Sequence, residues 1–379
     1  MEVIAIQFIS IFLIALILVN YCIPIIVRVS KAKYLYDEPN HRSVNNTGIP
    51  NLGGIALFIG ISIATLWGKQ YFVFPDFSYI LIAMILLFFV GIKDDIMTIS
   101  PTNKLVAQII SALILIIPGE IRFTNLHGIL GIYEINYTAS VIISLIAVVS
   151  ITNSINLIDG IDGLAAAIGI LTTIIFGTNF VLIGNYAYAM LCLAIIGSLS
   201  SFFVYNVFGR TNKIFMGDTG SLLIGILLSV FFIKYNEFSV KADDQVSNFS
   251  PVLSLAIMSI PIFDMIRVFF IRIFLNKSPF SADNNHIHHG LLKLGFSHLK
   301  STLIIIATNL FIIGIVYMLR IINNNLLLIL MGSTVIFSLL LPEWYCKYKN
   351  RKIAANPYFE TKSQISSGNT RKQTDSLID

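Results

Sequence analysis

Charged residues are scarce in this sequence. Only 12% of its 379 residues are Asp, Glu, Lys or Arg, whereas 56% are hydrophobic and the mean hydropathy is +0.83. A soluble globular protein carries about 25% charged residues, so the composition excludes that class. We expect an all-α integral membrane protein instead.

Cysteine is also rare. The three cysteines, Cys22, Cys192 and Cys346, are scattered and two of them lie in apolar runs, which excludes a disulfide framework and a thiolate metal site. The sequence also lacks an internal repeat and the Gly- or Pro-broken pair of half-helices that is typical of many transporters. No short basic segment precedes the first apolar stretch and no A-x-A site follows it, so we expect this stretch to be a span that is not cleaved.

Apolar stretches recur from one end of the chain to the other, and about 20 such residues cross the ~30 Å hydrocarbon core of a bilayer. We predict eleven spans, roughly at residues 3–27, 50–67, 77–92, 104–118, 139–152, 164–183, 187–208, 219–234, 250–271, 301–319 and 325–341. They would form one polytopic domain over residues 1–346. The polar tail at 347–379, rich in Ser, Asn, Gln and Lys, is expected to be disordered.

Lysine and arginine are unevenly divided between the alternate loops. With these spans, 19 of the 25 Lys and Arg residues fall in one set of loops and the tail, five fall in the other set, and Arg267 lies inside a span. The positive-inside rule therefore predicts an external N-terminus and a cytoplasmic C-terminus. The asymmetry accounts for the pI near 9.0, so we expect no nucleic-acid partner. The external loop at 118–138 has room for a short hairpin around Asn125 to Gly131.

The unusual polar clusters all fall in the inner loops. The third predicted span ends in Asp94 and Asp95, where two carboxylates meet the negative end of the helix macrodipole and repel each other. A solvated acid pair beside Lys93 would explain them. A nearby cation or phosphate-bearing substrate would explain them as well.

Four polar residues, Asn153, Asn156, Asp159 and Asp162, recur at every third position at the end of the fifth span. On an α-helix this spacing drifts through half a turn, so a tight 3₁₀-like or broken segment is needed to bring them together. Their side chains suit Mg²⁺, a nucleobase or a phosphate. An Asn/Asp/Gly turn that caps the next helix is the alternative.

The eighth span opens with the motif Phe215-Met-Gly-Asp218-Thr-Gly-Ser221. A helix N-terminus with glycine and small hydroxyl residues is an anion site. Asp218 has two interpretations, an ordinary N-cap and a ligand for a hard cation.

Three of the six histidines, His286, His288 and His289, lie within four residues after the ninth span. A zinc site would be incomplete there, with no Cys and no spaced Glu, whereas a loop that binds a diphosphate fits the neighbouring cations. A surface histidine cluster is the alternative. Inside the ninth span, Asp264 and Arg267 are predicted to form a structural pair.

These motifs resemble those of the polyprenyl-phosphate N-acetylhexosamine-1-phosphate transferase family. The first inner loop adds Asp37-Glu-Pro-Asn-His-Arg42 and Ile49-Pro-Asn-Leu-Gly-Gly54 to the resemblance. It covers about residues 1–341, with five motifs in order on one predicted membrane face, and the His-Ile-His-His form is similar to the UDP-HexNAc branch. Members initiate O-antigen, enterobacterial common antigen and teichoic-acid linkage synthesis and are related to phospho-MurNAc-pentapeptide translocase.

The resemblance implies a reaction in which polyprenyl (undecaprenyl) phosphate attacks the β-phosphorus of a UDP-HexNAc, foremost UDP-GlcNAc, and releases UMP with Mg²⁺ or Mn²⁺ as cofactor. It implies a multi-pass homodimer of the bacterial inner membrane with its active site on the cytoplasmic face. Asn156 and Asp218 would be metal ligands. The other implied roles are catalytic for Asp94, Asp95, Asp159 and His288, and substrate-binding for Arg42, Asn153, Asp162, Phe215, His286 and His289.

The mechanism has two alternatives. Asp94 either positions a lipid phosphate that is already mostly dianionic near pH 7, because its second pKa is about 6, or forms a covalent phosphosugar intermediate. A divalent-cation or proton-coupled transporter is the alternative from another class, since carboxylates in membrane proteins often mark ion paths. Transport sites lie near the bilayer midplane, whereas these carboxylates gather at helix ends, which favours the transferase.

Overall fold

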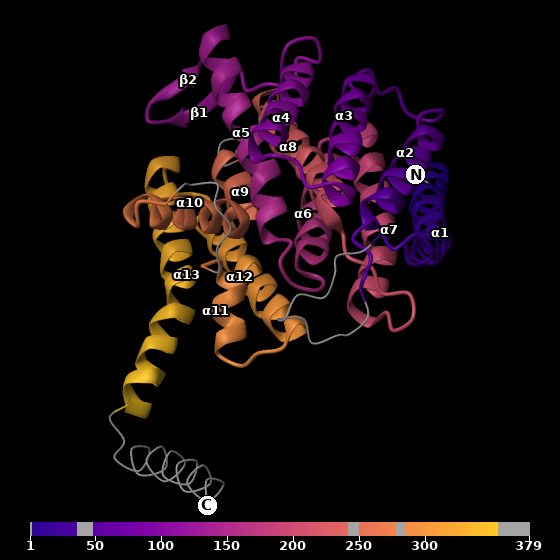
Figure 1. The fold of residues 1–379 in the computed structure, drawn as a ribbon. Coiled ribbons are helices and arrows are strands. Elements are labelled where there is room, and N and C mark those ends of the chain that lie inside the picture. Colours follow the sequence, from indigo (N-terminus) through magenta and orange to yellow (C-terminus); the bar gives the residue numbers. More distant parts are fainter. Residues whose placement is uncertain (1, 36–47, 242–249, 278–284, 355–379) are drawn as a thin grey trace, which may run out of the picture.

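The computed structural model describes residues 2–35, 48–241, 250–277 and 285–354, which form a helical bundle with one small hairpin (Figure 1). The elements are α1 (Glu2–Ala32), α2 (Gly53–Gly68), α3 (Phe77–Ile96), α4 (Pro101–Ile116), β1 (Asn125–Ile129), β2 (Ile132–Glu134), α5 (Tyr137–Ile158), α6 (Leu164–Leu182), α7 (Tyr186–Phe208), α8 (Gly217–Lys241), α9 (Ser250–Ile257), α10 (Ser259–Phe274), α11 (Ile287–Lys293), α12 (His298–Met318) and α13 (Asn324–Ala354).

Every predicted span falls on helix, and the expected polytopic helical bundle is confirmed. Eight of the described helices are long and apolar enough to cross a membrane, and the bent pair α9–α10 would make a ninth. Helices α2 and α4 are apolar but shorter, with 16 residues each. The number of eleven spans and the orientation therefore stay predictions.

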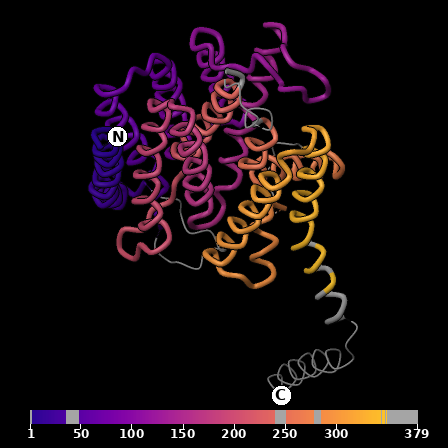
Figure 2. The backbone as a smooth tube through the Cα atoms, turned by 180° about the vertical axis from the view of Figure 1, so that it is seen from behind, coloured from indigo at the N-terminus to yellow at the C-terminus, as the bar shows by residue number. Residues whose placement is uncertain are grey.

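Helix α8 lies inside the bundle, with α1 at its edge (Figures 1 and 2). Of the apolar stretch of α8, 83% is buried, compared with 17% for α1. Helices α2, α3, α5 and α6 all pack on α8. The N-terminal end of α8 is thereby held among the ends of neighbouring helices, where the polar motifs lie.

Polar caps determine where two of these helices begin. The Ser100 hydroxyl accepts a hydrogen bond from Asn103 N at 3.3 Å, with Pro101 at the first helical position of α4. The Asn136 side chain accepts one from Ala139 N at 2.9 Å at the start of α5. Each bond satisfies a backbone N–H that has no partner within the helix, so both helices begin before the predicted spans do.

The ninth predicted span is not one straight helix. Helices α9 and α10 meet at an angle of 76° around Met258. Pro261 has no backbone N–H, so the carbonyl of Ile257 loses its usual helical donor. Asn309 of α12 supplies one instead, with Nδ2 at 3.0 Å from Ile257 O, and its Oδ1 accepts from the Ser259 hydroxyl at 3.0 Å. The bend thus has a buried polar partner from another helix.

The loop between α4 and α5 contains the predicted hairpin, since β1 and β2 pair antiparallel. The C-terminal boundary differs from the prediction. Helix α13 continues to Ala354, past the predicted start of the polar tail at residue 347. The rest of that tail, 355–379, lies outside the described residues.

Candidate active site

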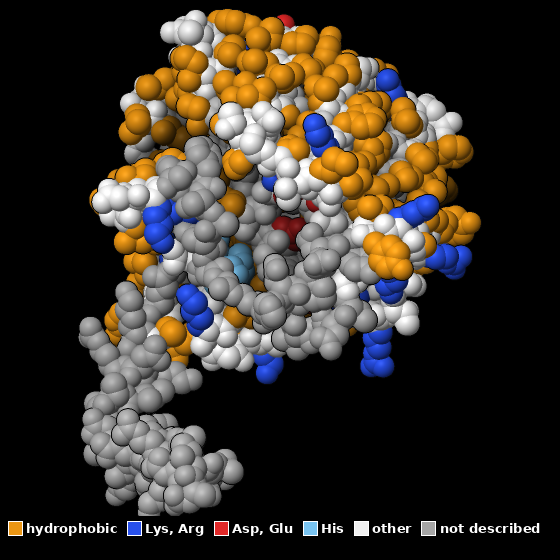
Figure 3. Space-filling view, in the orientation of Figure 1, with side chains coloured by type: hydrophobic (Ala, Val, Ile, Leu, Met, Phe, Trp, Pro, Cys, Tyr) orange, Lys and Arg blue, Asp and Glu red, His pale blue; other side chains and the backbone are white. Residues whose placement is uncertain are grey.

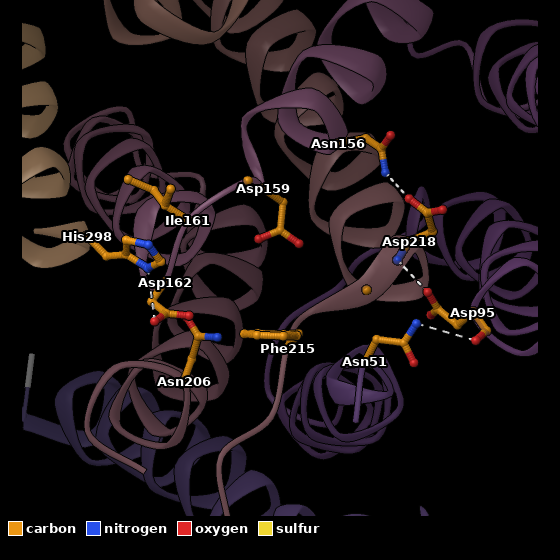
Figure 4. Close-up of a pocket in the computed structure, with 12 residues that line it drawn as sticks. Asn51, Asp95, Asn156, Asp159, Ile161, Asp162, Asn206, Phe215, Asp218 and His298 are labelled. Atoms are coloured by element: carbon orange, nitrogen blue, oxygen red, sulfur yellow. Dashed lines mark hydrogen bonds and ion pairs between the residues drawn. The ribbon is translucent and has the colours of Figure 1, made fainter. Parts of the chain in front are cut away.

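A polar cavity of about 380 Å³ opens at the C-terminal end of α5 and the N-terminal end of α8 (Figure 4). Because the hairpin precedes the other end of α5, the cavity and the hairpin lie at opposite ends of the bundle. Figure 3 shows acidic side chains recessed in a hollow, with a histidine side chain near its margin. The lining residues are Asn51, Asp95, Asn156, Asp159, Gly160, Ile161, Asp162, Asn206, Phe215, Gly217, Asp218 and His298.

Phe215 is fixed in the cavity by backbone pairing between two predicted motifs. Its N–H donates to Pro50 O at 2.8 Å, and its carbonyl accepts from Gly53 N at 3.0 Å. Gly54 N donates to Met216 O at 2.9 Å, and a Cβ on Gly54 would collide with the backbone of Gly220. Glycine therefore allows the start of α2 to approach α8 closely.

Asp95 caps α8. One carboxylate oxygen accepts from Asp218 N at 2.8 Å and the other from Thr219 N at 3.0 Å and from the Thr219 hydroxyl. A negative charge here is favourable, because it meets the unsatisfied N–H groups and the positive end of the helix dipole. The structure therefore gives Asp95 a capping role at the cavity wall.

Asp94 lies behind the cavity wall rather than among its lining residues. One oxygen accepts from Ile99 N at 2.8 Å, and Oδ2 is 2.7 Å from the ammonium of Lys104. The same ammonium is 2.7 Å from Oδ2 of Asp218. Lys104 therefore joins the predicted acid pair to the first turn of α8.

Asn156 is the second partner of Asp218. Its Nδ2 donates to Oδ1 of Asp218 and to the Ser221 hydroxyl, the latter at 2.8 Å. Asn156 lies in the last turn of α5, so the end of α5 and the start of α8 share a polar contact. Both predicted metal ligands are thus side by side in the cavity (Figure 4).

Asp159 stands apart from these pairs. It terminates α5, and no residue that the structure describes donates a hydrogen bond to its carboxylate. Burial raises its pKa to about 7, and the neighbouring carboxylates of Asp218, Asp95 and Asp162 add to the rise. A carboxylate in such surroundings is the group that a bound cation would stabilise most.

Asp162 lies at the other end of the cavity with two partners, the ammonium of Lys213 and the imidazole of His298. Its Oδ2 is 2.7 Å from Lys213 Nζ and 3.1 Å from His298 Nδ1. Burial opposes ionisation, but the hydrogen bonds from His298 and Lys213 lower the pKa of Asp162 below its usual value. Lys213 Nζ also lies 5.8 Å from the ring centre of Phe215, so this end of the cavity carries both a ring and positive charge.

The histidine motif does not line the cavity. His286 is buried and its Nδ1 lies 2.9 Å from Oδ2 of Asp264. His288 is also buried, and its ring packs against Gly160, a cavity residue. Burial and the neighbouring histidines His289 and His286 lower the pKa of His288 to about 3, so its imidazole is neutral near pH 7. The predicted direct contact of His288 with a diphosphate does not follow from this arrangement.

Asn153 does not line the cavity, because its amide forms reciprocal hydrogen bonds with Gln108 at 2.7 and 3.2 Å. Asn153 and Asn156 are about 60° apart around the axis of α5, and the Asn153 amide is engaged by Gln108 of α4. Arg42 lies outside the described residues.

Sequence reasoning missed Lys104, Lys213, His298 and Asn206. Asn206 joins two loops, since its Oδ1 accepts from Gly163 N at 2.6 Å and its Nδ2 donates to Ile214 O at 2.9 Å. The two lysines were counted only toward membrane orientation. Only their contacts with carboxylates far away in the sequence identify them as site residues, and a single sequence does not show such contacts.

Taken together, apolar spans and an acidic cavity at their ends define a polytopic membrane protein with a polar binding site at one end of the bundle. Residues 77–236 match the profile of Glycosyl transferase family 4. The chain is 30% identical over 332 residues, 87% of its length and 88% of the relative's, to the probable undecaprenyl-phosphate N-acetylglucosaminyl 1-phosphate transferase of Bacillus subtilis (strain 168).

Two other relatives are named undecaprenyl-phosphate alpha-N-acetylglucosaminyl 1-phosphate transferase. The protein of Salmonella typhi is 29% identical over 341 residues, 89% of this chain and 85% of its own. That of Escherichia coli (strain K12) is 28% identical over 281 residues, 73% and 74% of the two chains. The chain belongs to this family of glycosyl transferases, as the motifs predicted, and the names of these relatives give no support to the transporter alternative.

Proposed function

We propose that this protein transfers a HexNAc-1-phosphate, foremost GlcNAc-1-phosphate, from a UDP-sugar to undecaprenyl phosphate and releases UMP. The observation that carries the proposal is the cavity itself, which is lined by the ring of Phe215 and by the carboxylate of Asp218, and Asp218 is ion-paired with Lys104. A nucleoside diphosphate-sugar has two corresponding parts, a flat base that can stack on the ring and a charged diphosphate.

The base would stack on Phe215. In Figure 4 the ring of Phe215 is seen edge-on, with one face toward the part of the cavity that contains Asp159. Aromatic stacking suits any base and carries little specificity by itself. The polar edge of uracil would then meet Asp162 and its partners, which border the same ring.

The diphosphate would lie toward Asp218 and Lys104. The reaction forms a bond between an oxygen of the lipid phosphate and the β-phosphorus, and it breaks the bond from the β-phosphorus to the bridging oxygen, which leaves with UMP. The nucleophile is mostly dianionic near pH 7, because its second pKa is about 6, so no general base is required. Catalysis then depends on positioning and charge neutralisation, for which the Lys104 ammonium beside Asp94 and Asp218 is placed.

Magnesium fits the donor set of the cavity. Asp218, Asp159 and Asn156 offer carboxylate and amide oxygens, and Mg²⁺ in enzymes is held by one or two carboxylates together with water and substrate phosphates. Among the described residues no three His, Cys, Asp or Glu side chains form an all-protein metal site, so water and substrate phosphates would have to complete the coordination. When bound, the ion would neutralise charge on the transferring phosphoryl group, and Mn²⁺ would serve the same donor set.

The cavity would face the cytoplasm of a bacterial inner membrane. The loops rich in lysine and arginine connect the same ends of the predicted spans at which the cavity lies, and such loops are typically cytoplasmic. Single cysteines introduced into a cysteine-free protein would test the orientation. Leu130 is exposed in the hairpin, and Arg210 is exposed after α7. We expect Leu130→Cys to react with an impermeant maleimide in intact cells, and Arg210→Cys only after permeabilisation. The reverse pattern would overturn the assignment.

A donor panel tests the function. Purified protein in liposomes with undecaprenyl phosphate would be supplied in turn with UDP-GlcNAc, UDP-GalNAc and 6-deoxy-HexNAc donors, and UMP would be measured. We expect UMP release with at least one UDP-HexNAc, dependent on the lipid. The same assay on cross-linked and monomeric fractions tests the homodimer that the family resemblance implies. Absence of UMP with every donor, from folded protein, would contradict the function.

A further inference from the structure

The histidine motif is separated from the cavity by one glycine. A Cβ on Gly160 would lie closer than 3.0 Å to the imidazole of His288, which real Cβ atoms essentially never show. Gly160 lines the cavity between Asp159 and Asp162. Its φ is not among the positive values of the chain, so the close contact, and not backbone strain, explains why this residue is glycine.

The imidazole of His288 is buried behind Gly160. Its side chain is 1% exposed, and neither ring nitrogen has a hydrogen-bond partner among the described residues. Its ring lies parallel to that of His286, with centres 5.7 Å apart and 4° between the planes. A ligand in the cavity would therefore meet the backbone of Gly160 before it met His288.

Asp264 anchors the motif from the other side. Its carboxylate is 2% exposed and accepts from Arg267 Nη2 at 2.9 Å and from Ile287 N at 3.1 Å, while its second oxygen contacts His286 Nδ1 at 2.9 Å. The carboxylate thereby ties α10 to the first turn of α11. A carboxylate on Nδ1 also fixes the orientation of an imidazole, as it does for many ligand histidines.

We infer that Asp264, His286 and His288 are positioning residues, which hold the Asp159–Asp162 turn in place through the contact of His288 with Gly160. The inference rests on the proposed function and deepens it, because Asp159 and Asp162 lie at the two ends of the nucleotide-diphosphate site. It also changes the predicted role of His288, from a group that contacts the diphosphate to a side chain that supports the turn. The bent pair α9–α10 contributes to the site in this way although α9 and α10 supply no lining residue.

A double-mutant cycle distinguishes support from direct contact. Gly160→Ala places a methyl group against the imidazole, and we expect kcat to fall at least 100-fold. His288→Ala alone should lower kcat less than tenfold with little change in KM. The combined variant Gly160→Ala/His288→Ala should recover at least tenfold over Gly160→Ala, because the methyl group then occupies space left by the ring. A double variant as inactive as Gly160→Ala, or a His288→Ala variant more than 100-fold impaired, would overturn the inference.

The melting temperature gives a second readout that does not depend on the reaction. It should fall in Gly160→Ala and rise again in the double variant, and no rise would overturn the inference even if no donor is turned over. Asp264→Asn should lower kcat, and adding His288→Ala to it should lower kcat no further, because both act along one chain of contacts. Full additivity of the two would contradict this.

Asp76→Asn is the matched control. Asp76 also joins a cation and a polar ring group, Lys234 at 2.8 Å and the Tyr188 hydroxyl at 2.6 Å, but it precedes α3 at the opposite end from Asp94 and Asp95. The helix between them is about 30 Å long. The control should lose melting temperature without losing kcat. If wild-type protein releases no UMP, the proposed function fails, whereas an active wild type without rescue refutes only the inference.

Discussion

Lys104 and Asp218 meet in the structure although they are 114 residues apart, with Nζ 2.7 Å from Oδ2. The same ammonium is 2.7 Å from Asp94. The contact brings the start of α4, the end of α3 and the first turn of α8 to one point at the cavity. Two acidic motifs that are far apart in the sequence thus share one positive charge, that of Lys104.

Replacing Lys104 should damage catalysis more than binding. Lys104→Met removes the positive charge and leaves Asp94 and Asp218 to repel each other, so we expect kcat to fall about 100-fold or more, the scale reported for removal of one electrostatic stabiliser. Lys104→Arg keeps the charge but not the geometry, so it should lower kcat less than Lys104→Met does. Steady-state kinetics with the UDP-sugar would check both. Equal activity of Lys104→Met and wild type would remove Lys104 from the mechanism.

Asp94 should act by position and not as a nucleophile. Its oxygens are already engaged by Ile99 N and Lys104, and the lipid phosphate needs no activation. Exchange of labelled UMP into UDP-sugar by delipidated enzyme should therefore require undecaprenyl phosphate. If Asp94 were a covalent nucleophile, Asp94→Asn would abolish turnover. Lipid-independent exchange in the wild type would establish a covalent intermediate instead and leave the transferase assignment standing.

Removal of divalent cations should abolish activity. EDTA is expected to stop UMP release, and Mg²⁺ or Mn²⁺ to restore it, since the oxygen-rich end of the cavity suits a hard cation. Asp218→Ala should not recover at ordinary Mg²⁺ concentrations, because a carboxylate of this cluster is gone. Asp76→Asn, far from the cavity, should keep the metal response of wild type. Undiminished activity in EDTA, or in Asp218→Ala, would contradict the role proposed for the ion.

His288 should make the fold less stable in acid. Its pKa is lowered from 6.5 to about 3 in the folded chain, so below pH 6.5 the unfolded chain binds a proton that the folded chain does not. Stability from this residue therefore falls as pH falls from about 6.5 toward 3. Between pH 7.5 and pH 5 the stability advantage of wild type over His288→Asn should shrink by about 2 kcal/mol. Melting of both proteins in detergent at the two pH values measures it, and a constant difference would show that His288 titrates normally.

The parts of the fold that depend on long local signals could be predicted. Each apolar stretch that was predicted as a span is helical in the structure. The turn around Gly128 and Gly131, both with positive φ, forms the expected hairpin. The bend at Met258 could not be predicted as such, because its stability depends on Asn309, a buried side chain some 50 residues away. An isolated Pro261 near a helix start is compatible with a straight helix as well.

The candidate site was predictable where residue type alone limits the chemistry. Asn156, Asp159, Asp162 and Asp218 were singled out by residue type and spacing, Phe215 was implied by the family resemblance, and all five line one cavity. The histidines of the motif at 286–289 were predicted to contact the diphosphate, but none of them lines the cavity. Their burial behind Gly160 follows from the packing of α10, α11 and the α5–α6 turn, which no local pattern encodes. His298 begins α12 and reaches Asp162 for the same tertiary reason.

Transfer of the phosphorus atom tests the central claim most directly. Purified enzyme would be incubated with undecaprenyl phosphate and the accepted UDP-HexNAc labelled with ³²P at the β-phosphate, and lipid and water-soluble products would be separated. A sugar-1-phosphate transferase moves the label to the lipid, in equal amount to the sugar, and leaves unlabelled UMP. If sugar reaches the lipid while the label remains in UDP, or if neither moves, the enzyme does not carry out the proposed reaction.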